Sequence, residues 1–361
     1  MSIGRNFTAT FFGESHGECV GVVVYGCPAG LRFDEEFINH ELKRRSPIDY
    51  TISTSRVEDD RVKVFSGVFN GYTTGAPICM AVYNRNVDSS FYEELRFKPR
   101  PGHADYTAYI KYSGFNDFRG GGIFSGRITA AYVLAGALAK MVLKTLNIEV
   151  IAHTVEIAGV KARPLSIEEI RRNVHSNIVR CADLDAAYLM IEKIRKAAEN
   201  GDSVGGVVEC IALNVPPGIG DPPIDTLEGD IAKALFAIPA VKGVEFGLGF
   251  NFARAYGSEC NDQFTILNGK VTMKTNNCGG ILGGISCGTP IVCRAVFKPP
   301  PSIRKPQKTV DLRNMEETVI EVKGRYDACI VPRAIPVVEG MTSIVLADHA
   351  IRSGLIKNVL R

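Results

Sequence analysis

The 361-residue sequence lacks the features that mark several large classes of protein. None of its ten cysteines forms a CxxC pair, so closely spaced thiolate ligands for zinc are missing, and we expect reduced, buried thiols and no metal. The 42 basic and 39 acidic residues leave a net charge of only +3, which does not favour nucleic acid or a membrane surface as a partner. Any cationic site must therefore come from local clustering.

Long apolar segments are also scarce. The first residues contain no apolar core of the kind found in signal peptides, and the most apolar stretch, residues 130–146, includes Lys140 and Lys144 and is short for a membrane span. We predict that this stretch is a buried helix and that the protein is soluble and cytoplasmic. With 45% hydrophobic residues, the chain can bury the core of one large domain or of two ordinary ones.

Capping and turn residues divide the chain into predicted elements. Strands are predicted at 20–25, 62–69 and 77–83, and helices at 126–146 and 341–359. Asp34 can cap a helix through Arg45, Asp183 can cap residues 184–200, and Ser166 with Glu169 forms a capping box. A similar start at Asp225 predicts a helix through residue 237.

Two parts of the chain resemble each other. Residues 67–78 and 280–291 share three glycines and a proline in one register, and Pro28-Ala29-Gly30 matches Pro216-Pro217-Gly218 upstream. Chance is the alternative in a chain with 36 glycines. We interpret the match as a duplication, with repeats at about 15–150 and 200–340 inside one integrated domain of residues 1–361.

Two histidines lie in glycine-containing loops, where backbone can approach a ligand closely. His16 stands in Gly13-Glu14-Ser15-His16-Gly17, and His103 in Arg100-Pro101-Gly102-His103. An imidazole titrates near neutrality and can give or take a proton. A lone loop histidine is more often structural, but two such loops favour a shared cleft.

Glycine-rich and basic segments predict anion binding. Gly120-Gly121-Gly122 precedes a helix start, where free N–H groups and the helix dipole attract anions, and Arg127 adds a charge there. A plain tight turn is the alternative. Further basic clusters lie at 43–45, 298–302 and 323–327, and dinucleotide, Walker and nucleophile-elbow motifs are absent. The pattern indicates an enzyme acting on a small polyanion, with a phosphorylated cofactor.

Taken together, the segments resemble the chorismate synthase family. The matching segments run in family order across nearly the whole chain: residues 12–17, 66–71, 100–106, 117–122, 201–205, 241–245, 279–286, 298–299 and 324–327. The resemblance implies an α+β fold in which helices lie between antiparallel sheets (a β-α-β sandwich), and a homotetramer. It also implies elimination of phosphate and a ring proton from 5-enolpyruvylshikimate 3-phosphate to give chorismate, with reduced FMN as cofactor and NADPH as a candidate reductant.

The resemblance also implies roles for individual residues. His16 protonates the departing phosphate, His103 stabilises charge or donates a proton at the flavin, and Asp327 takes part in proton removal through flavin N5. Arg45 and Arg127 hold substrate anions. The remaining residues are expected at the flavin: Ile123, Phe124, Ser125, Pro239, Ala240, Gly283, Lys298, Pro299, Pro300, Pro301, Ser302 and Arg325.

The sequence departs from the family pattern at two cationic positions. Ile123 and Thr51 stand where the family usually has arginine. We interpret these changes as variation within an active enzyme, because both histidines remain. The alternatives are an inactive flavin- or phosphometabolite-binding protein on the same scaffold, and a flavin reductase or other NAD(P)H oxidoreductase.

Overall fold

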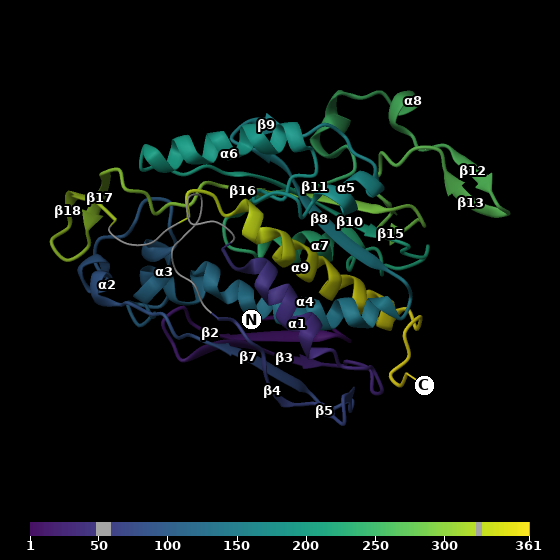
Figure 1. Cartoon of the computed structure of the whole chain (residues 1–361), viewed down its shortest axis with the longest axis horizontal. Coiled ribbons are helices and arrows are strands. Elements are labelled where there is room, and N and C mark those ends of the chain that lie inside the picture. Colours follow the sequence, from purple (N-terminus) through teal and green to yellow (C-terminus); the bar gives the residue numbers. More distant parts are fainter. Residues whose placement is uncertain (48–58, 323–326, 361) are drawn as a thin grey trace.

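The protein consists of two antiparallel sheets with long helices between them (Figure 1). The computed structural model describes residues 1–47, 59–322 and 327–360. Each of the two main sheets has five strands, and the buried helices pack their apolar side chains with those of both sheets in one core. This arrangement confirms the predicted α+β class with helices between antiparallel sheets.

The first sheet is built from the N-terminal part of the chain, in the order β1-β2-β3-β7-β4. Its inner face is apolar because alternate residues of the strands, such as Val20, Val22 and Val24, point toward the helices and are fully buried. Its strands and the attached hairpin are β1 (Ser2–Ile3), β2 (Thr8–Gly13), β3 (Cys19–Tyr25), β4 (Lys63–Ser66), β7 (Ile78–Tyr83), β5 (Val68–Phe69) and β6 (Tyr72–Thr73).

The second sheet has the order β11-β16-β10-β8-β9. Three further two-stranded hairpins extend from the body of the protein, and Figure 1 shows the β12–β13 hairpin projecting farthest. The strands are β8 (Glu149–Ile157), β9 (Val160–Lys161), β10 (Gly206–Leu213), β11 (Val241–Phe246), β16 (Ile291–Phe297), β12 (Phe264–Leu267), β13 (Lys270–Met273), β14 (Ile281–Leu282), β15 (Ile285–Ser286), β17 (Gln307–Asp311) and β18 (Glu316–Ile320).

Three of the four predicted helix caps are confirmed. The Asp34 side chain accepts from the Phe37 amide, Asp183 accepts from two amides of its helix, and Ser166 with Glu169 forms the capping box. The helices are α1 (Glu35–Arg45), α2 (Ser90–Leu95), α3 (Asp105–Lys111), α4 (Thr129–Lys144), α5 (Ile167–Asn173), α6 (Leu184–Glu199), α7 (Leu227–Phe236), α8 (Gly257–Cys260) and α9 (Val331–Arg352), with 3-10 turns η1 (Arg119–Phe124), η2 (Gly126–Ile128) and η3 (Gly249–Arg254).

Two predicted helix starts were wrong. The cap of α7 is Thr226, whose hydroxyl accepts from the Gly229 amide, whereas Asp225 pairs with Arg5. The last helix begins at Val331, ten residues before the predicted start at 341. Pro336 and Gly340 lie inside this helix, where both residue types are usually unfavourable, and packing in the core compensates for them.

The central contact of the core is the crossing of α4 and α9. At this crossing Gly136 and Gly340 meet, and a Cβ atom placed on Gly136 would lie 2.2 Å from the Cα of Gly340. Both helices are apolar and long enough to cross a membrane by length and composition, yet 89% and 100% of their apolar windows are buried inside the protein. The stretch at residues 130–146 is therefore a buried helix, as predicted.

We expect Gly136→Ala to destabilise the fold by about 3 kcal/mol or more. Overpacking a core costs about 1–3 kcal/mol, and here the clash is with backbone, which cannot rotate away. Thermal unfolding measures the effect. Gly340→Ala is the matched control, because its Cβ would lie 3.3 Å from its nearest neighbours, and a smaller loss is expected. Equal stability of the wild type and the Gly136 variant would contradict the close approach.

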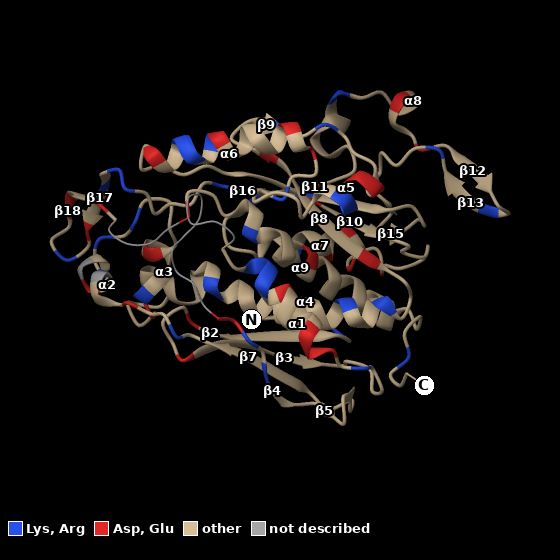
Figure 2. Cartoon of the chain, viewed as in Figure 1, with Lys and Arg blue, Asp and Glu red and all other residues tan. Residues whose placement is uncertain are grey.

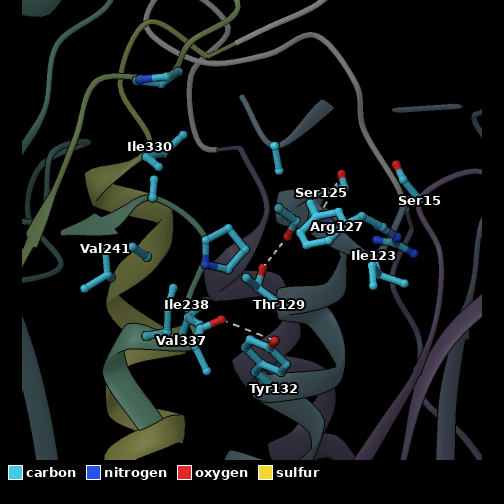
Figure 3. A pocket seen from close by; sticks show the side chains of 18 of the residues that line it. Ser15, Ile123, Ser125, Arg127, Thr129, Tyr132, Ile238, Val241, Ile330 and Val337 are labelled. Carbon is cyan, nitrogen blue, oxygen red and sulfur yellow. Dashed lines mark hydrogen bonds between the residues drawn. The ribbon is translucent and has the colours of Figure 1, made fainter. Parts of the chain in front are cut away.

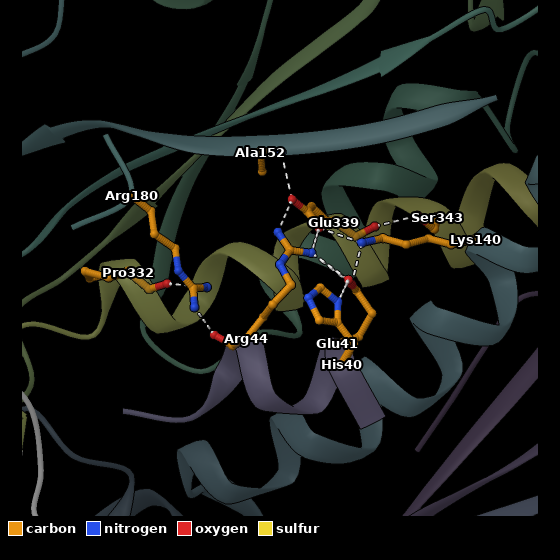
Figure 4. Close-up of polar contacts among 9 residues, drawn as sticks. All are labelled: His40, Glu41, Arg44, Lys140, Ala152, Arg180, Pro332, Glu339 and Ser343. Carbon is orange, nitrogen blue, oxygen red and sulfur yellow. Dashed lines mark hydrogen bonds and ion pairs between the residues drawn. The ribbon is translucent and has the colours of Figure 1, made fainter. Parts of the chain in front are cut away.

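A buried network of charges ties the central helices together (Figure 4). Glu339 of α9 accepts hydrogen bonds from Arg44 of α1, at 2.6 and 2.8 Å, and from Lys140 of α4 and the amide of Ala152. Burial alone would raise the pKa of Glu339, but Arg44 and Lys140 hold it well below its ordinary range. The network therefore fixes α1 relative to α4 and α9. Arg45, the last residue of α1, directly follows Arg44 and is positioned with it.

The two halves of the chain have the same order of elements. In the first sheet the strands β2-β3-β7-β4 are neighbours in that order, and in the second sheet β8-β10-β16-β11 follow the same order. In each half a helix follows the second strand, a glycine-rich hairpin precedes the last strand, and a long central helix, α4 or α9, comes later. This is the arrangement that a duplication requires.

Candidate active site

One cavity of about 1400 Å³ brings most of the predicted site residues together. Its lining comes from helices α4 and α9 and from loops such as those of His16 and His103, so both halves of the chain contribute. Sites for one small ligand usually measure about 300–1,000 Å³, so this cavity has room for two small molecules side by side. Fourteen of the predicted residues line it: His16, Arg45, His103, Ile123, Phe124, Ser125, Arg127, Pro239, Ala240, Lys298, Pro300, Pro301, Ser302 and Asp327.

Three predicted residues are not among the lining residues. Gly283 lies in the turn between β14 and β15, and Pro299 packs beside Gly205. Arg325 lies outside the described residues, as does Thr51. Arg5, another N-terminal cation, pairs with Asp225 and also does not line the cavity.

His16 reaches the cavity from the loop between β2 and β3. Its Nδ1 lies 2.8 Å from the Ser89 hydroxyl, and its ring packs edge-on against Tyr92, with 5.2 Å between the ring centres. Both contacts come from a segment more than 70 residues away in the sequence. These two contacts fix the position of the His16 ring at the cavity.

His103 lies at the start of α3, where Asp105 is the first helical residue. Its Nδ1 lies 2.6 Å from Asp105 Oδ1, and Arg100 forms a two-point contact with the same carboxylate. Burial is the largest cause that lowers the pKa of His103, and Arg100 and Lys298 act in the same direction against Asp105. At neutral pH this imidazole is therefore expected to be uncharged.

The triple glycine separates the two histidines. A Cβ atom on Gly120 would lie 2.5 Å from the His16 ring, and one on Gly121 would lie 3.0 Å from the His103 ring. All three glycines have positive φ angles, 60°, 83° and 54°, which L side chains rarely adopt. Backbone shape and close contact with both imidazoles therefore require glycine here, and the anion binding expected of this loop stays a prediction.

We expect Gly120→Ala to slow turnover by about 10- to 100-fold, because the methyl group must displace His16 and a shift of about 1 Å at a reacting group can cost 100-fold. Steady-state kinetics measures the effect. Gly159→Ala is the matched control: it has a similar φ of 81° and open space around it, so it introduces backbone strain alone. A wild-type rate in the Gly120 variant would show that the position of His16 is unimportant.

The two predicted substrate arginines share a buried carboxylate. Asp60 Oδ2 accepts from Arg45 Nη2 at 2.7 Å and from Arg127 Nη1 at 2.9 Å. Burial alone would raise the pKa of Asp60, but the two guanidinium groups lower it, while burial lowers the pKa of Arg45 to about 10. Two guanidinium groups thus share one carboxylate, and the trio contributes one net positive charge to the cavity wall.

Asn84 connects Arg127 to the His16 loop. Its Oδ1 accepts from Arg127 Nε at 2.7 Å, and its Nδ2 donates to the carbonyls of Glu14 and Gly17 at 2.9 and 2.8 Å. Neither Asn84 nor Asp60 was predicted from the sequence. Their only sequence signal is position, since Asn84 directly follows β7 and Asp60 precedes β4.

Lys298 joins the second half of the site to the His103 loop. Its amide donates to the Ala240 carbonyl at 3.0 Å, and its Nζ donates to the carbonyl of Gly102. Ala240 has a φ of 73°, unusual for a residue with a side chain, so the turn at Pro239 is held by its surroundings. Arg100 extends the connection by donating to the Ser302 hydroxyl at 3.2 Å.

The cavity is lined by an excess of cationic side chains and also has an apolar part. Seven basic but only two acidic side chains occur among its described lining residues. In Figure 3, Tyr132, Ile238 and Val337 lie together at one end, while Ser15, Ile123 and Arg127 lie toward the opposite side. In the described part of the chain no group of three His, Cys, Asp or Glu side chains could hold a metal ion. The cavity thus fits an anionic ligand with one flat apolar part.

Comparison with known proteins agrees with this site. The family model of chorismate synthase matches residues 7–351. A chorismate synthase of Dehalococcoides mccartyi is 54% identical over 360 residues, covering 100% of this chain and 99% of the relative, and one of Methanosarcina barkeri is 53% identical over 353 residues, covering 98% and 96%.

A solved structure shows the same fold. A crystal structure of chorismate synthase matches with a TM-score of 0.77 at 31% identity, covering 97% of this chain and 93% of the other. The cavity with its two histidines, the full-length relatives and this structural match lead to one conclusion. The chain belongs to the chorismate synthase family, a family of lyases of aromatic amino-acid biosynthesis that need a reduced flavin.

Proposed function

We propose that the cavity carries out the elimination of phosphate and a ring proton from 5-enolpyruvylshikimate 3-phosphate, with reduced FMN as the flavin. The observation that carries the proposal is that His16 and His103, 87 residues apart in the sequence, line one cationic cavity together with Asp327. The substrate has two carboxylates and a phosphate, which suit the excess of basic side chains around it.

The lining residues fit a flavin as well as the substrate. The apolar end at Tyr132, Ile238 and Val337 would take the hydrocarbon part of the isoalloxazine, and Lys298 supplies a cation for its charged part. When bound, reduced FMN supplies electron density that helps the allylic phosphate leave and recovers it afterwards, so the reaction has no net redox change. The residues assigned to holding it are Ile123, Phe124, Ser125, Pro239, Ala240, Lys298, Pro300, Pro301 and Ser302, with Gly283, Pro299 and Arg325 assigned from family resemblance alone.

The chain's own groups have separate tasks. His16, fixed by Ser89 and Tyr92, protonates the leaving phosphate, and the carboxylate of Asp327 receives the ring proton. Asp327 accepts from Arg333 Nη1 at 2.7 Å, which orients the carboxylate. Arg45 and Arg127, held by Asp60, bind substrate anions, and His103 stabilises charge on the flavin side of the site.

Phosphate release tests the reaction directly. The protein, substrate and dithionite-reduced FMN are mixed without oxygen, and inorganic phosphate is measured over time. We expect catalytic release with reduced FMN and none with oxidised FMN. Binding of FMN without phosphate release would favour the alternative of an inactive binding protein, and would overturn the proposal.

The reductant, the assembly and the compartment complete the proposal. NADPH is the candidate reductant, which anaerobic mixing tests through bleaching of the bound flavin.

The proposed assembly is a homotetramer in the cytoplasm. Its support is the projecting β12–β13 hairpin, where Phe264, Ile266 and Val271 are 67%, 74% and 71% exposed, since apolar clusters of this kind mark protein contacts. Light scattering measures the assembly, and a monomer would contradict it.

A further inference from the structure

The carboxylate of Asp105 lies behind His103 and outside the cavity lining. It contacts the imidazole through Oδ1, at 2.6 Å from Nδ1, and it receives Arg100 through both oxygens, at 2.7 and 2.9 Å. The Arg100 amide also donates to Oδ2 at 3.0 Å. Burial alone would raise the pKa of Asp105, but Arg100 and His103 hold it far below its ordinary range, so the carboxylate is ionised.

These contacts restrict the protons of the imidazole. An ionised carboxylate only accepts hydrogen bonds and a guanidinium only donates them. Nδ1, which faces Asp105, must therefore carry the proton. Arg100 Nη2 lies 3.1 Å from Nδ1 and 3.3 Å from Nε2, so its contact with the ring does not distinguish the two nitrogens. The shorter contact of 2.6 Å between Nδ1 and the carboxylate decides the tautomer. A proton on both nitrogens would place a second cation beside Arg100 and near Lys298.

We propose that Asp105 is a positioning residue that holds His103 as the neutral tautomer protonated on Nδ1, with Arg100 keeping the carboxylate ionised. His103 then presents the lone pair of Nε2 and enters the reaction as an acceptor of a hydrogen bond or a proton. The charged groups around the ring are Asp105 from α3, Arg100 from the preceding loop and Lys298 from the segment after β16. The tautomer stands on geometry alone, whereas the catalytic consequence rests on the proposed function.

The contacts of Asp105 also limit the direction in which His103 can transfer a proton. Because Asp105 is saturated by Arg100 and backbone, it does not take the imidazole proton itself. His103 can therefore become a donor only after Nε2 has first gained a proton inside the cavity. This order separates its role from that of His16, whose Nδ1 faces a neutral hydroxyl.

The test combines a tautomer measurement with kinetics. The ring nitrogens of ¹⁵N-histidine-labelled, ligand-free protein are recorded by NMR near pH 7, and the His103 signals are assigned by their loss in His103→Gln. Wild type, Asp105→Asn, Asp105→Glu and Asp311→Asn are compared. Asp311 is the matched control, since it also is buried and pairs with the side chain and amide of an arginine, Arg313, but does not line the cavity.

We expect wild-type His103 to show a protonated Nδ1 and an unprotonated Nε2. In Asp105→Asn this preference should be lost and kcat should fall by about 10- to 100-fold, the usual range for a residue that orients a functional histidine. FMN affinity should stay unchanged, Asp105→Glu should restore part of the rate, and Asp311→Asn should keep both the tautomer and the rate.

Two results would overturn the assignment: a wild-type His103 protonated on Nε2, or an Asp105→Asn variant with the wild-type tautomer and rate. Because the wild-type spectrum alone decides the tautomer, the test survives an Asp105 variant that does not fold. The predicted tautomer in a protein that releases no phosphate would support the assignment of Asp105 and refute the proposed reaction instead.

Discussion

Alanine in place of His16 or His103 is expected to slow phosphate release by about 100-fold or more, the scale of lost acid–base assistance. His16 is the group placed to protonate the leaving phosphate, and without that proton the departing group carries more charge. His103 contributes from the other side of Gly120 and Gly121, the glycines that separate the two rings. Because the two imidazoles contact different glycines, we expect each single variant to lose rate independently.

The two histidine variants should remain folded. Neither ring belongs to the main apolar core, and melting temperature and FMN binding are the readouts that separate a catalytic loss from a structural one. His40→Ala is the control, because that side chain is 66% exposed and does not line the cavity. Wild-type rates in both site variants would contradict the roles given to them.

Replacement of Glu339 by glutamine is expected to cost about 3–5 kcal/mol at neutral pH, the usual cost of breaking a buried ion pair by removing one partner. Arg44 and Lys140 would then share only the carboxylate of Glu41 in a place with little access to water. Chemical denaturation measures the change. Glu192→Gln is the control: its pair with Arg195 is about half exposed, and such pairs contribute only about 0–1 kcal/mol.

The same variant should change the dependence of stability on pH. The folded-state pKa of Glu339 lies below the unfolded value of about 4.3, so its stabilisation is present above that value and is lost as the pH falls toward the folded pKa. Wild-type stability should therefore fall below about pH 5, and the glutamine variant should fall less steeply. If the free energies of unfolding of the two proteins fell in parallel as the pH is lowered, the network would not stabilise the fold.

Local signals in the sequence predicted the elements well. Caps at Asp34, Ser166 and Asp183 depend on a few neighbouring residues, and the structure confirms them. The start of α9 could not be found in this way, because Pro336 and Gly340 are tolerated only through packing against α4. Helix propensity thus gave the wrong helix start where tertiary contacts compensate for unfavourable residues.

Many residues expected at the site line the cavity, but the side chains that hold them in place were not predicted from the sequence. Glycine-flanked histidines and basic residues pointed to His16, His103, Arg45, Arg127 and Lys298, which all line the cavity. Other lining residues, such as Pro239 and Ala240, were expected from the family resemblance alone. The partners that hold them, Asp60 between two arginines and Asn84 between Arg127 and the His16 loop, come from distant segments and leave no local pattern. Arg127, whose charge at a helix start predicted a nearby anion, also pairs with the Asp60 carboxylate, a partner that the sequence did not indicate.

The equal order of elements in the two halves bears on the origin of the site. We propose that the halves arose by duplication, as the matching glycine-rich segments suggest, and that the cavity formed where they meet. The lining agrees with this origin, since His16, Arg45 and Arg127 come from the first half, and Lys298 and Asp327 from the second.

A crystal structure with oxidised FMN and 5-enolpyruvylshikimate 3-phosphate bound together tests the central claim most directly. The proposal requires both ligands in the one cavity, with the phosphate of the substrate within hydrogen-bonding distance of His16 and the flavin ring over the apolar end at Tyr132. Ligands in separate places, or a substrate phosphate turned away from His16, would contradict it.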